Sequence, residues 1–332
     1  MNIQQASGED SETIVGLFKR YHFALLSKEW LAWKYHANPI GNAQNYKILL
    51  EGRIVGAVAI LPQRFIWRGR EVIGLQAVDG LLGKEIRGQG NFSRVMQFLA
   101  AQQPVGAPEE SFHLSFPSLP ASIRAHESSG WNRLASFSLS ICMLTPGLPL
   151  KKAGVSIMRR ALEFPWAAYR KWIMGPKTGT VQVRCWNGNE AEFNAFAPVE
   201  QICGDRSAKF MKWRVKDNPR DDIHVLMIYE REILQGYAVV KINGGTTQVL
   251  ELRLRRPRRL HIQGLVRYIY THHHSDAVAF WSLGRSRVHT LIRGMGFVRR
   301  HRSGHCFVQH LERAGLPADP DEWDLTYLDS DW

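Results

Sequence analysis

Apolar residues recur along the chain in two similar series of short runs. In the first series, an apolar run from Tyr46 to Leu50, a charged turn and a second apolar run from Ile54 to Leu61 predict a β-hairpin. In the second series, the runs from Val225 to Tyr229 and from Ile233 to Ile242 flank the charged turn Glu230-Arg231-Glu232 in the same way. Each half of the chain therefore starts with a predicted hairpin.

A shared motif precedes both hairpins. Trp33, a basic residue and Asn38-Pro39 recur as Trp213, a basic residue and Asn218-Pro219, at an offset of 180 positions. Because proline stops a helix, each motif predicts the end of a helix. Similarity at a fixed offset indicates an internal repeat.

Both halves also end alike, on a helical stretch that closes with a glycine and an aromatic residue. These pairs are Gly130-Trp131 and Gly296-Phe297, and glycine there fits a left-handed helix C-cap. Between the halves, a stretch rich in Lys, Arg and aromatic residues predicts one or two amphipathic helices broken at Pro165.

One glycine-rich turn has the residues of a possible anion-binding site. A strand-like run from Leu75 to Gly83, a turn at 85–90 and a helical stretch from Asn91 to Gln102 form the layout of an anion site. Glycines let successive N–H groups and the positive end of the helix dipole approach a pyrophosphate, and Arg87 and Arg94 would add charge. Such a turn can also be a plain loop, and it lacks the dinucleotide and P-loop fingerprints.

The segment from Asp79 to Phe92 resembles the acetyl-CoA loop of GNAT N-acetyltransferases, whose pattern is Arg/Gln-x-x-Gly-x-Gly/Ala. Arg87 and Gly90 match this pattern. Phe92 departs from it at the last small position and resembles a variant of tandem GNAT groups that runs Arg-Gly-x-Gly-hydrophobic-Phe. The CoA loop therefore resembles that of a tandem member.

A second GNAT hallmark follows the loop. The run from Phe112 to Phe116, Ser118 and the helix ending on Gly130-Trp131 occupy the family's places, with His126 where the family has tyrosine. The likeness covers about a quarter of the chain, Gly74 to Trp131. The second half has no Arg-x-x-Gly and carries Ile292 at the tyrosine position, so it resembles a degenerate copy.

The resemblance implies an α+β fold of two tandem GNAT-like domains, each a mixed and mostly antiparallel sheet flanked by helices. The expected parts are an N-terminal domain at 1–148, a basic amphipathic connector at 149–179, a degenerate domain at 180–312 and an acidic tail at 313–332. Apolar residues in the tail predict that it docks on basic protein surface: Trp323, Leu325, Tyr327 and Leu328.

The resemblance also implies direct acyl transfer from acetyl-CoA, or another acyl-CoA, to a primary amine of a small molecule or amino sugar. The first half alone is expected to bind CoA. The residues expected around CoA are Leu81, Leu82, Arg87, Gly88, Gln89, Gly90, Asn91, Phe92 and Ser118.

Two residues are catalytic candidates. His126 could protonate the leaving thiolate, since its ordinary pKa near 6.5 leaves a protonated fraction at neutral pH; the alternative is a surface histidine at a helix end. Asp79 could hold the acceptor ammonium or relay its proton, or else Asp79-Gly80 marks a bulge or turn. No metal is expected, because the run from His272 to Asp276 suggests a loop without separated ligands.

The net positive charge of the chain is also compatible with other binding partners. The formal net charge of +13 indicates an anionic partner, and the run from Arg253 to Arg259 could meet phosphate or form a solvated strand edge. Nucleic-acid binding is disfavoured because no RNP1 signature appears, while membrane-surface contact through 157–172 in a non-catalytic protein stays an alternative. The polar N-terminus and the lack of a run of ~20 apolar residues predict a cytoplasmic protein.

Overall fold

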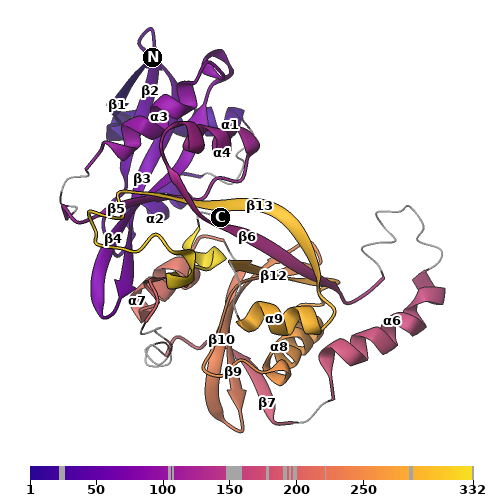
Figure 1. Ribbon diagram of the computed structural model, residues 1–332. Helices are drawn as coiled ribbons and strands as arrows, with labels where there is room; N and C mark the ends of the chain where they lie inside the picture. Colours follow the sequence, from indigo (N-terminus) through magenta and orange to yellow (C-terminus); the bar gives the residue numbers. More distant parts are fainter. Residues whose placement is uncertain are drawn as a thin grey trace.

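Thirteen strands form one continuous sheet in the computed structural model (Figure 1). The structure describes residues 1–21, 27–103, 106, 108–146, 159–176, 179–189, 193, 196, 200–220, 222–283 and 287–330. The strands of the first half are β1 (Asn2–Gln5), β2 (Gln44–Leu50), β3 (Arg53–Trp67), β4 (Arg70–Leu82), β5 (Phe112–Ser115) and β6 (Asn132–Met143). Those of the second half are β7 (Val181–Cys185), β8 (Cys203–Gly204), β9 (Ile223–Glu230), β10 (Ile233–Asn243), β11 (Thr246–Leu254), β12 (Ala277–Leu283) and β13 (Val298–Gln309).

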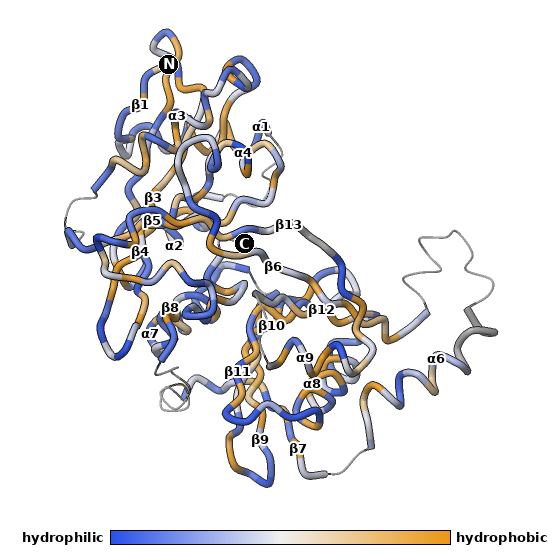
Figure 2. The backbone as a smooth tube through the Cα atoms, in the orientation of Figure 1, coloured by the Kyte–Doolittle hydropathy of each residue, from blue (hydrophilic) through white to orange (hydrophobic). Residues whose placement is uncertain are grey.

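Helices cover both faces of this sheet. They are α1 (Ser11–Arg20), α2 (Lys28–His36), α3 (Asn91–Ala100), α4 (Pro120–Ser128), α6 (Arg159–Met174), α7 (Ala208–Met211), α8 (Arg259–His272) and α9 (Arg287–Gly294). Figure 2 shows hydrophobic segments concentrated along the strands, and a hydrophilic turn at the tip of the β3–β4 hairpin. Among the described residues, none of the helices has the length and apolar character needed to cross a membrane.

The two halves exchange their last strands. The sheet order is β1-β2-β3-β4-β5-β13-β6-β12-β11-β10-β9-β7, so β13 lies between β5 and β6 (Figure 1). Strand β6 in turn pairs with β12 of the second half along seven residues. The halves predicted as separate domains therefore share one sheet, while the domain boundaries themselves stay a prediction.

The repeated tryptophans meet where the halves join. Trp33 Nε1 donates to the Trp213 carbonyl at 2.8 Å, and Trp213 Nε1 donates to the Trp33 carbonyl at 3.1 Å. Their rings stack with centroids 5.2 Å apart. Reciprocal contacts between equivalent residues indicate a local pseudo-twofold arrangement, so the sequence repeat is also a packing motif.

Both predicted hairpins are confirmed. Their two-residue turns take left-handed conformations, with φ of 51° and 76° at Glu51 and Gly52 and of 50° and 63° at Arg231 and Glu232. Such turns match the right-handed twist of the flanking strands. Strand β3 is longer than the apolar run predicted, because it continues through Trp67 into a further turn.

The glycine caps of α4 and α9 are also confirmed. Gly130 and Gly296 both have φ of 83°. The next residue closes the cap in each half, with Trp131 N donating to His126 O at 3.1 Å and Phe297 N to Ile292 O at 3.4 Å. His126 and Ile292 are therefore equivalent positions of the two halves.

Two local predictions were wrong, and a third is confirmed except at its first residue. Helix α6 continues through Pro165, which the sequence suggested would break it, although residues 149–158 of the connector lie outside the described residues. The loop predicted from His272 to Asp276 covers 273–276, while His272 is the last residue of helix α8. Arg253 lies buried in an interior strand, since β11 pairs on both sides, so this part of the basic run is no solvated sheet edge.

The C-terminal tail docks on the protein as its apolar residues predicted. Trp323, Leu325 and Leu328 are buried. Asp324 pairs with Arg253 at 2.5 Å and Asp329 with Arg206 at 2.8 Å. The tail is thus part of the folded core.

Candidate active site

A cleft opens where two parallel strands separate. Strands β4 and β5 pair over four residues, Gly74–Ala77 with Phe112–Ser115, and then β4 continues to Leu82 without β5, paired only with β3. The cleft has a volume of about 590 Å³ and lies between Val78–Leu82 and Phe116–Leu119. A concave space of this size fits a small ligand.

A bulge in β4 coincides with the opening. Asp79 has φ of 52°, and the β3–β4 register shifts between Ala57 and Ala59. Gly80 follows, where a side chain would meet the Phe92 ring at about 3.0 Å. The alternative that Asp79-Gly80 marks a bulge is therefore confirmed.

The glycine turn forms one end of the cleft. Gly88, Gln89 and Gly90 have φ of 82°, 52° and 72°, and Gly90 is the N-cap of α3. The Asn91 side chain is buried, and its amide donates to Ile86 O at 2.9 Å, which ties the turn to the helix. The first N–H groups of a helix lack partners within it, so this end suits an anion.

Arg87 lies beside the turn at the cleft. Its Nε donates to Leu82 O at 2.9 Å, and its guanidinium carbon lies 4.8 Å from the centre of the Tyr21 ring. These contacts orient the side chain, which lines the cleft. A cation there complements the positive helix end.

The structure brings most residues expected around CoA to this one cleft. Six of the nine line it: Leu81, Leu82, Arg87, Gly88, Phe92 and Ser118. Gln89, Gly90 and Asn91 lie in the adjoining turn and the start of α3. Their assignment to CoA stays a prediction.

His126 lies in the cleft wall as a buried ring. It is 1% exposed and packs against Trp131 and Phe307, with ring centres 5.3 and 5.2 Å away. Its Nδ1 lies 2.7 Å from Ser122 O, and because a carbonyl only accepts, Nδ1 carries the proton. Nε2 is buried without a hydrogen-bond partner among the described residues.

This environment corrects the reasoning about His126. Burial lowers its pKa below the ordinary value of 6.5, against the smaller opposing effect of the Ser122 hydrogen bond. The protonated fraction at pH 7 is therefore smaller than that of an ordinary histidine, and the neutral ring predominates. The alternative of a surface histidine is wrong, because the side chain is buried.

Asp79 is bound to two residues of α2. Its Oδ2 accepts from Lys34 Nζ at 2.6 Å and from Tyr35 OH at 2.7 Å. Lys34 is fully buried, with Nζ 4.5 Å from the centre of the Trp30 ring. An acceptor ammonium at Asp79 would therefore meet a carboxylate that is already paired with a cation.

Sequence reasoning missed the part played by Lys34 and Tyr35. Both stand inside the repeated motif after Trp33, where Lys34 was noted only as a shared basic residue. A lysine directly between two aromatic residues, Trp33 and Tyr35, was the available signal, because a lysine buried with such neighbours needs an anionic partner. The partner, 45 positions away, could not be identified from spacing.

Comparison with known proteins finds likeness at the level of structure. No family model and no curated protein sequence matches the chain. A probable N-acyltransferase of Enterococcus faecalis is similar with a TM-score of 0.63 and 11% identity over 94% of this chain and 73% of that one.

Two further solved structures bear on the arrangement of the halves. A GCN5-related N-acetyltransferase of Anabaena variabilis has a TM-score of 0.61 and 14% identity over 93% of this chain and 72% of its own. A tandem GNAT protein from the clavulanic acid biosynthesis pathway has a TM-score of 0.56 and 11% identity over 93% of this chain and 98% of its own. The chain therefore has the fold of GNAT N-acetyltransferases, including that of a tandem GNAT protein.

Proposed function

We propose that this protein is an acyl-CoA-dependent N-acyltransferase that moves an acetyl group from acetyl-CoA to the primary amine of a small molecule or amino sugar. The observation that carries the proposal is the cleft at the β4–β5 opening, with the left-handed turn Gly88-Gln89-Gly90 at one end. The GNAT fold supports it, since these two features occupy the places implied by the sequence resemblance.

The chain's residues fit such a substrate at three points. The turn and the start of α3 present N–H groups to a pyrophosphate, and Arg87 adds positive charge. The β4 stretch from Val78 to Leu82 extends beyond its β5 partner, so its backbone can hydrogen-bond an amide-bearing arm. Apolar Leu81 and Leu82 would pack against that arm.

His126 has a role consistent with its neutral ring. The amine nitrogen attacks the thioester carbonyl carbon, the carbon–sulfur bond breaks, and one proton passes from the nitrogen to the departing thiolate. His126 Nε2 holds a lone pair, and we propose that it takes this proton from the nitrogen and returns it to sulfur. No covalent bond to the protein is needed.

Asp79 would act together with Lys34 and Tyr35. Its carboxylate is fixed at the cleft by these two α2 side chains, so it can orient an incoming amine by hydrogen bonding. In this proposal the ion pair positions the amine while His126 moves its proton.

Acetyl-CoA binding tests the proposal directly. Calorimetry of the full chain should give one acetyl-CoA site per chain, and incubation with acetyl-CoA and a panel of amines should release free thiol. Absence of acetyl-CoA binding at millimolar concentration would refute the function while leaving the fold as described.

A further inference from the structure

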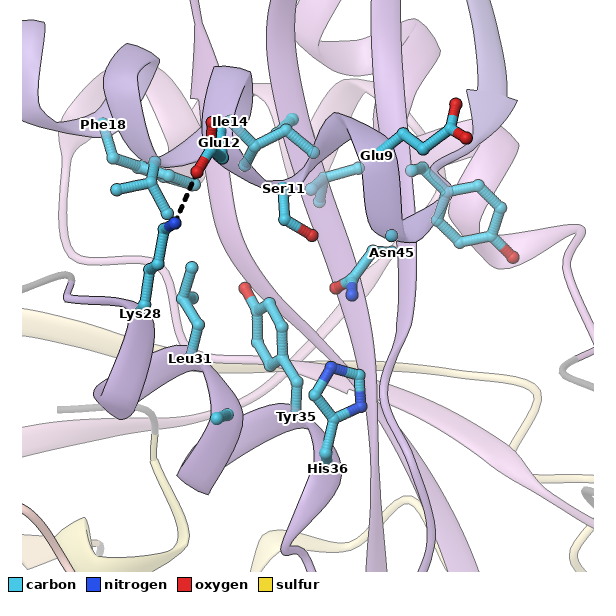
Figure 3. A pocket seen from close by; sticks show the side chains of 16 residues that line it. Glu9, Ser11, Glu12, Ile14, Phe18, Lys28, Leu31, Tyr35, His36 and Asn45 are labelled. Carbon is cyan, nitrogen blue, oxygen red and sulfur yellow. Dashed lines mark hydrogen bonds and ion pairs between the residues drawn. The ribbon is translucent and has the colours of Figure 1, made fainter.

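A second cavity lies beneath the first two long helices. The helix pocket, as we name it, has a volume of about 570 Å³ and is enclosed by α1, α2, β2 and β3. Figure 3 shows Ser11 from α1, Tyr35 and His36 from α2, and Asn45 from β2 around its centre. All of its lining residues belong to the described part of the chain.

Four polar side chains lie near the centre of this pocket: Ser11, Tyr35, His36 and Asn45. Asn45 Oδ1 is buried and has no hydrogen-bond partner among the described residues. Ser11 Oγ and the His36 ring form no hydrogen bond within the part of the chain that the structure describes, and Figure 3 shows both beside the open space. Ser11 and His36 are exposed, so water can satisfy them, whereas the buried Asn45 Oδ1 is costly to leave unpaired. This atom indicates a ligand with a hydrogen-bond donor.

Charge and apolar surface narrow the chemistry of that ligand. The lining carboxylate of Glu12 is paired with Lys28 at 2.5 Å at the rim, and Glu9 is the other acidic lining residue. A phosphate or carboxylate ligand would find no unpaired lysine or arginine in the lining. Apolar side chains such as Leu31 form the remaining wall, which suits the C–H face of a ring that carries hydroxyl groups.

The helix pocket adjoins the cleft. Val58 lines both cavities, and Tyr35, in the pocket wall, donates to Asp79 in the cleft wall at 2.7 Å. Tyr35 therefore links the two cavities, since it lines the pocket and its hydroxyl contacts Asp79 in the cleft wall. An acceptor amine that extends from the pocket to Asp79 would replace this hydroxyl contact.

We infer that the helix pocket binds the body of the acceptor, and that the acceptor is a small polyhydroxylated amine whose hydroxyls bond Ser11, Tyr35, His36 and Asn45. This inference rests on the proposed acyl transfer for its biological meaning. The binding site itself requires only the pocket.

Calorimetry of the full chain with D-glucosamine, D-galactosamine and cyclohexylamine, each without acetyl-CoA, tests the inference. At least one amino sugar should bind at one site and at least about tenfold tighter than cyclohexylamine, because only the sugars satisfy the polar groups. Asn45→Leu should weaken sugar binding at least about tenfold, and Ser11→Ala at the exposed start of α1 at least about threefold. Asn132→Leu, an exposed asparagine outside the pocket, should change nothing.

The outcomes separate the two proposals. Three results, each obtained with normal acetyl-CoA binding, would overturn the polyhydroxylated acceptor and leave the acyltransferase. They are no sugar binding, cyclohexylamine binding as tight as sugar binding, and sugar binding that is unchanged in both Asn45→Leu and Ser11→Ala. Sugar binding that depends on Asn45 without any acetyl-CoA binding would keep the pocket and refute the acyltransferase.

Discussion

The parallel strands of the two halves pair to the same extent. In the first half β4 and β5 pair over four residues and then separate, and in the second half β11 and β12 also pair in parallel over four residues, Thr246–Val249 with Ala277–Phe280. Beyond that point the first half has an open cleft. In the second half the C-terminal tail contacts both strands, with Tyr327 stacked on Trp281 at 4.1 Å between ring centres.

The turns that follow the central strands differ as well. Eight residues, with left-handed glycines, link β4 to α3, whereas Arg255–Arg258 link β11 to α8. Arg258, the N-cap of α8, is extended with φ of −133° and lacks the left-handed conformation of Gly90. Among the described residues, the linker before α8 therefore lacks the left-handed turn, and the tail lies against the two strands that correspond to β4 and β5. We expect that restoring the turn alone would not restore a CoA site.

A buried ion cluster holds the tail in the second half. Arg206 pairs with Glu251 at 2.7 Å and with Asp329 at 2.8 Å, and Thr326 Oγ1 donates to Glu251 at 2.7 Å. Burial opposes the charge on Glu251, but Arg206 and Arg253 outweigh it and lower the pKa of Glu251 to about 2. The carboxylate is thus ionised at neutral pH.

The largest expected effect comes from breaking this cluster. Arg206→Met leaves Glu251 and Asp329 without their main cation and should lower the free energy of unfolding by about 3–5 kcal/mol. Urea unfolding measures the loss. Arg184→Met, which removes an exposed pair with Glu232, should cost at most about 1 kcal/mol. Equal losses in the two variants would show that the tail is not held by the cluster.

The second effect concerns the turn that only the first half has. Gly90→Glu puts a carboxylate at the N-terminus of α3 and a side chain on a left-handed residue, so acetyl-CoA should bind at least about 100-fold more weakly, or about 2.7 kcal/mol. Gly52→Glu carries the same backbone strain in a distant hairpin turn and is the matched control. If calorimetry gave both variants wild-type affinity, the turn would not be the pyrophosphate site.

A smaller effect is expected at the equivalent cap positions His126 and Ile292, where only the first half has a titratable side chain. His126→Phe should lower kcat at least about tenfold while leaving acetyl-CoA affinity nearly unchanged, because the proposed proton relay is lost. His126→Tyr should recover part of the rate. His113→Phe is the control, since burial also lowers the pKa of His113, to about 4, but this residue lies outside the cleft lining. Unchanged kcat in His126→Phe would assign the ring to packing alone.

The smallest effect is the pH dependence of the wild-type rate. Because burial lowers the pKa of His126, the ring is neutral above its ordinary value of 6.5, and kcat should change less than about twofold between pH 7 and 9. It should fall as the pH drops well below 6.5 and the ring becomes protonated. A kcat that falls steadily from pH 7 to 9 would instead indicate that the protonated ring is the active form.

Local signals in the sequence predicted the local parts of the fold. The hairpin at Glu51-Gly52, the cap at Gly130 and the turn at Gly88–Gly90 each depend on a few adjacent residues, so their patterns could be read directly. The resemblance added the place of His126 at the cleft but not its burial.

The remaining features depend on contacts between distant residues. The assembly of the whole sheet decides which distant residues meet. Examples are the ion pair of Asp79 with Lys34, the pairing of β13 with β5 and the stacking of Tyr327 on Trp281. The pKa of His126 is a further case, because Phe307, which packs on it, comes from the last strand of the other half. Composition and periodicity carry no information on such partners.

The strand exchange has a consequence for synthesis of the chain. The edge of β5 that faces away from the cleft is paired by β13, which lies about 180 residues later in the chain, so the proposed catalytic half stays incomplete until Val298–Gln309 has been synthesised. Pairing of strands so far apart in sequence slows folding and leaves an unpaired strand edge exposed meanwhile. A chain released before β13 is synthesised would therefore carry the glycine turn and His126 but would expose the unpaired edge of β5. Strands of other nascent proteins could pair with that edge.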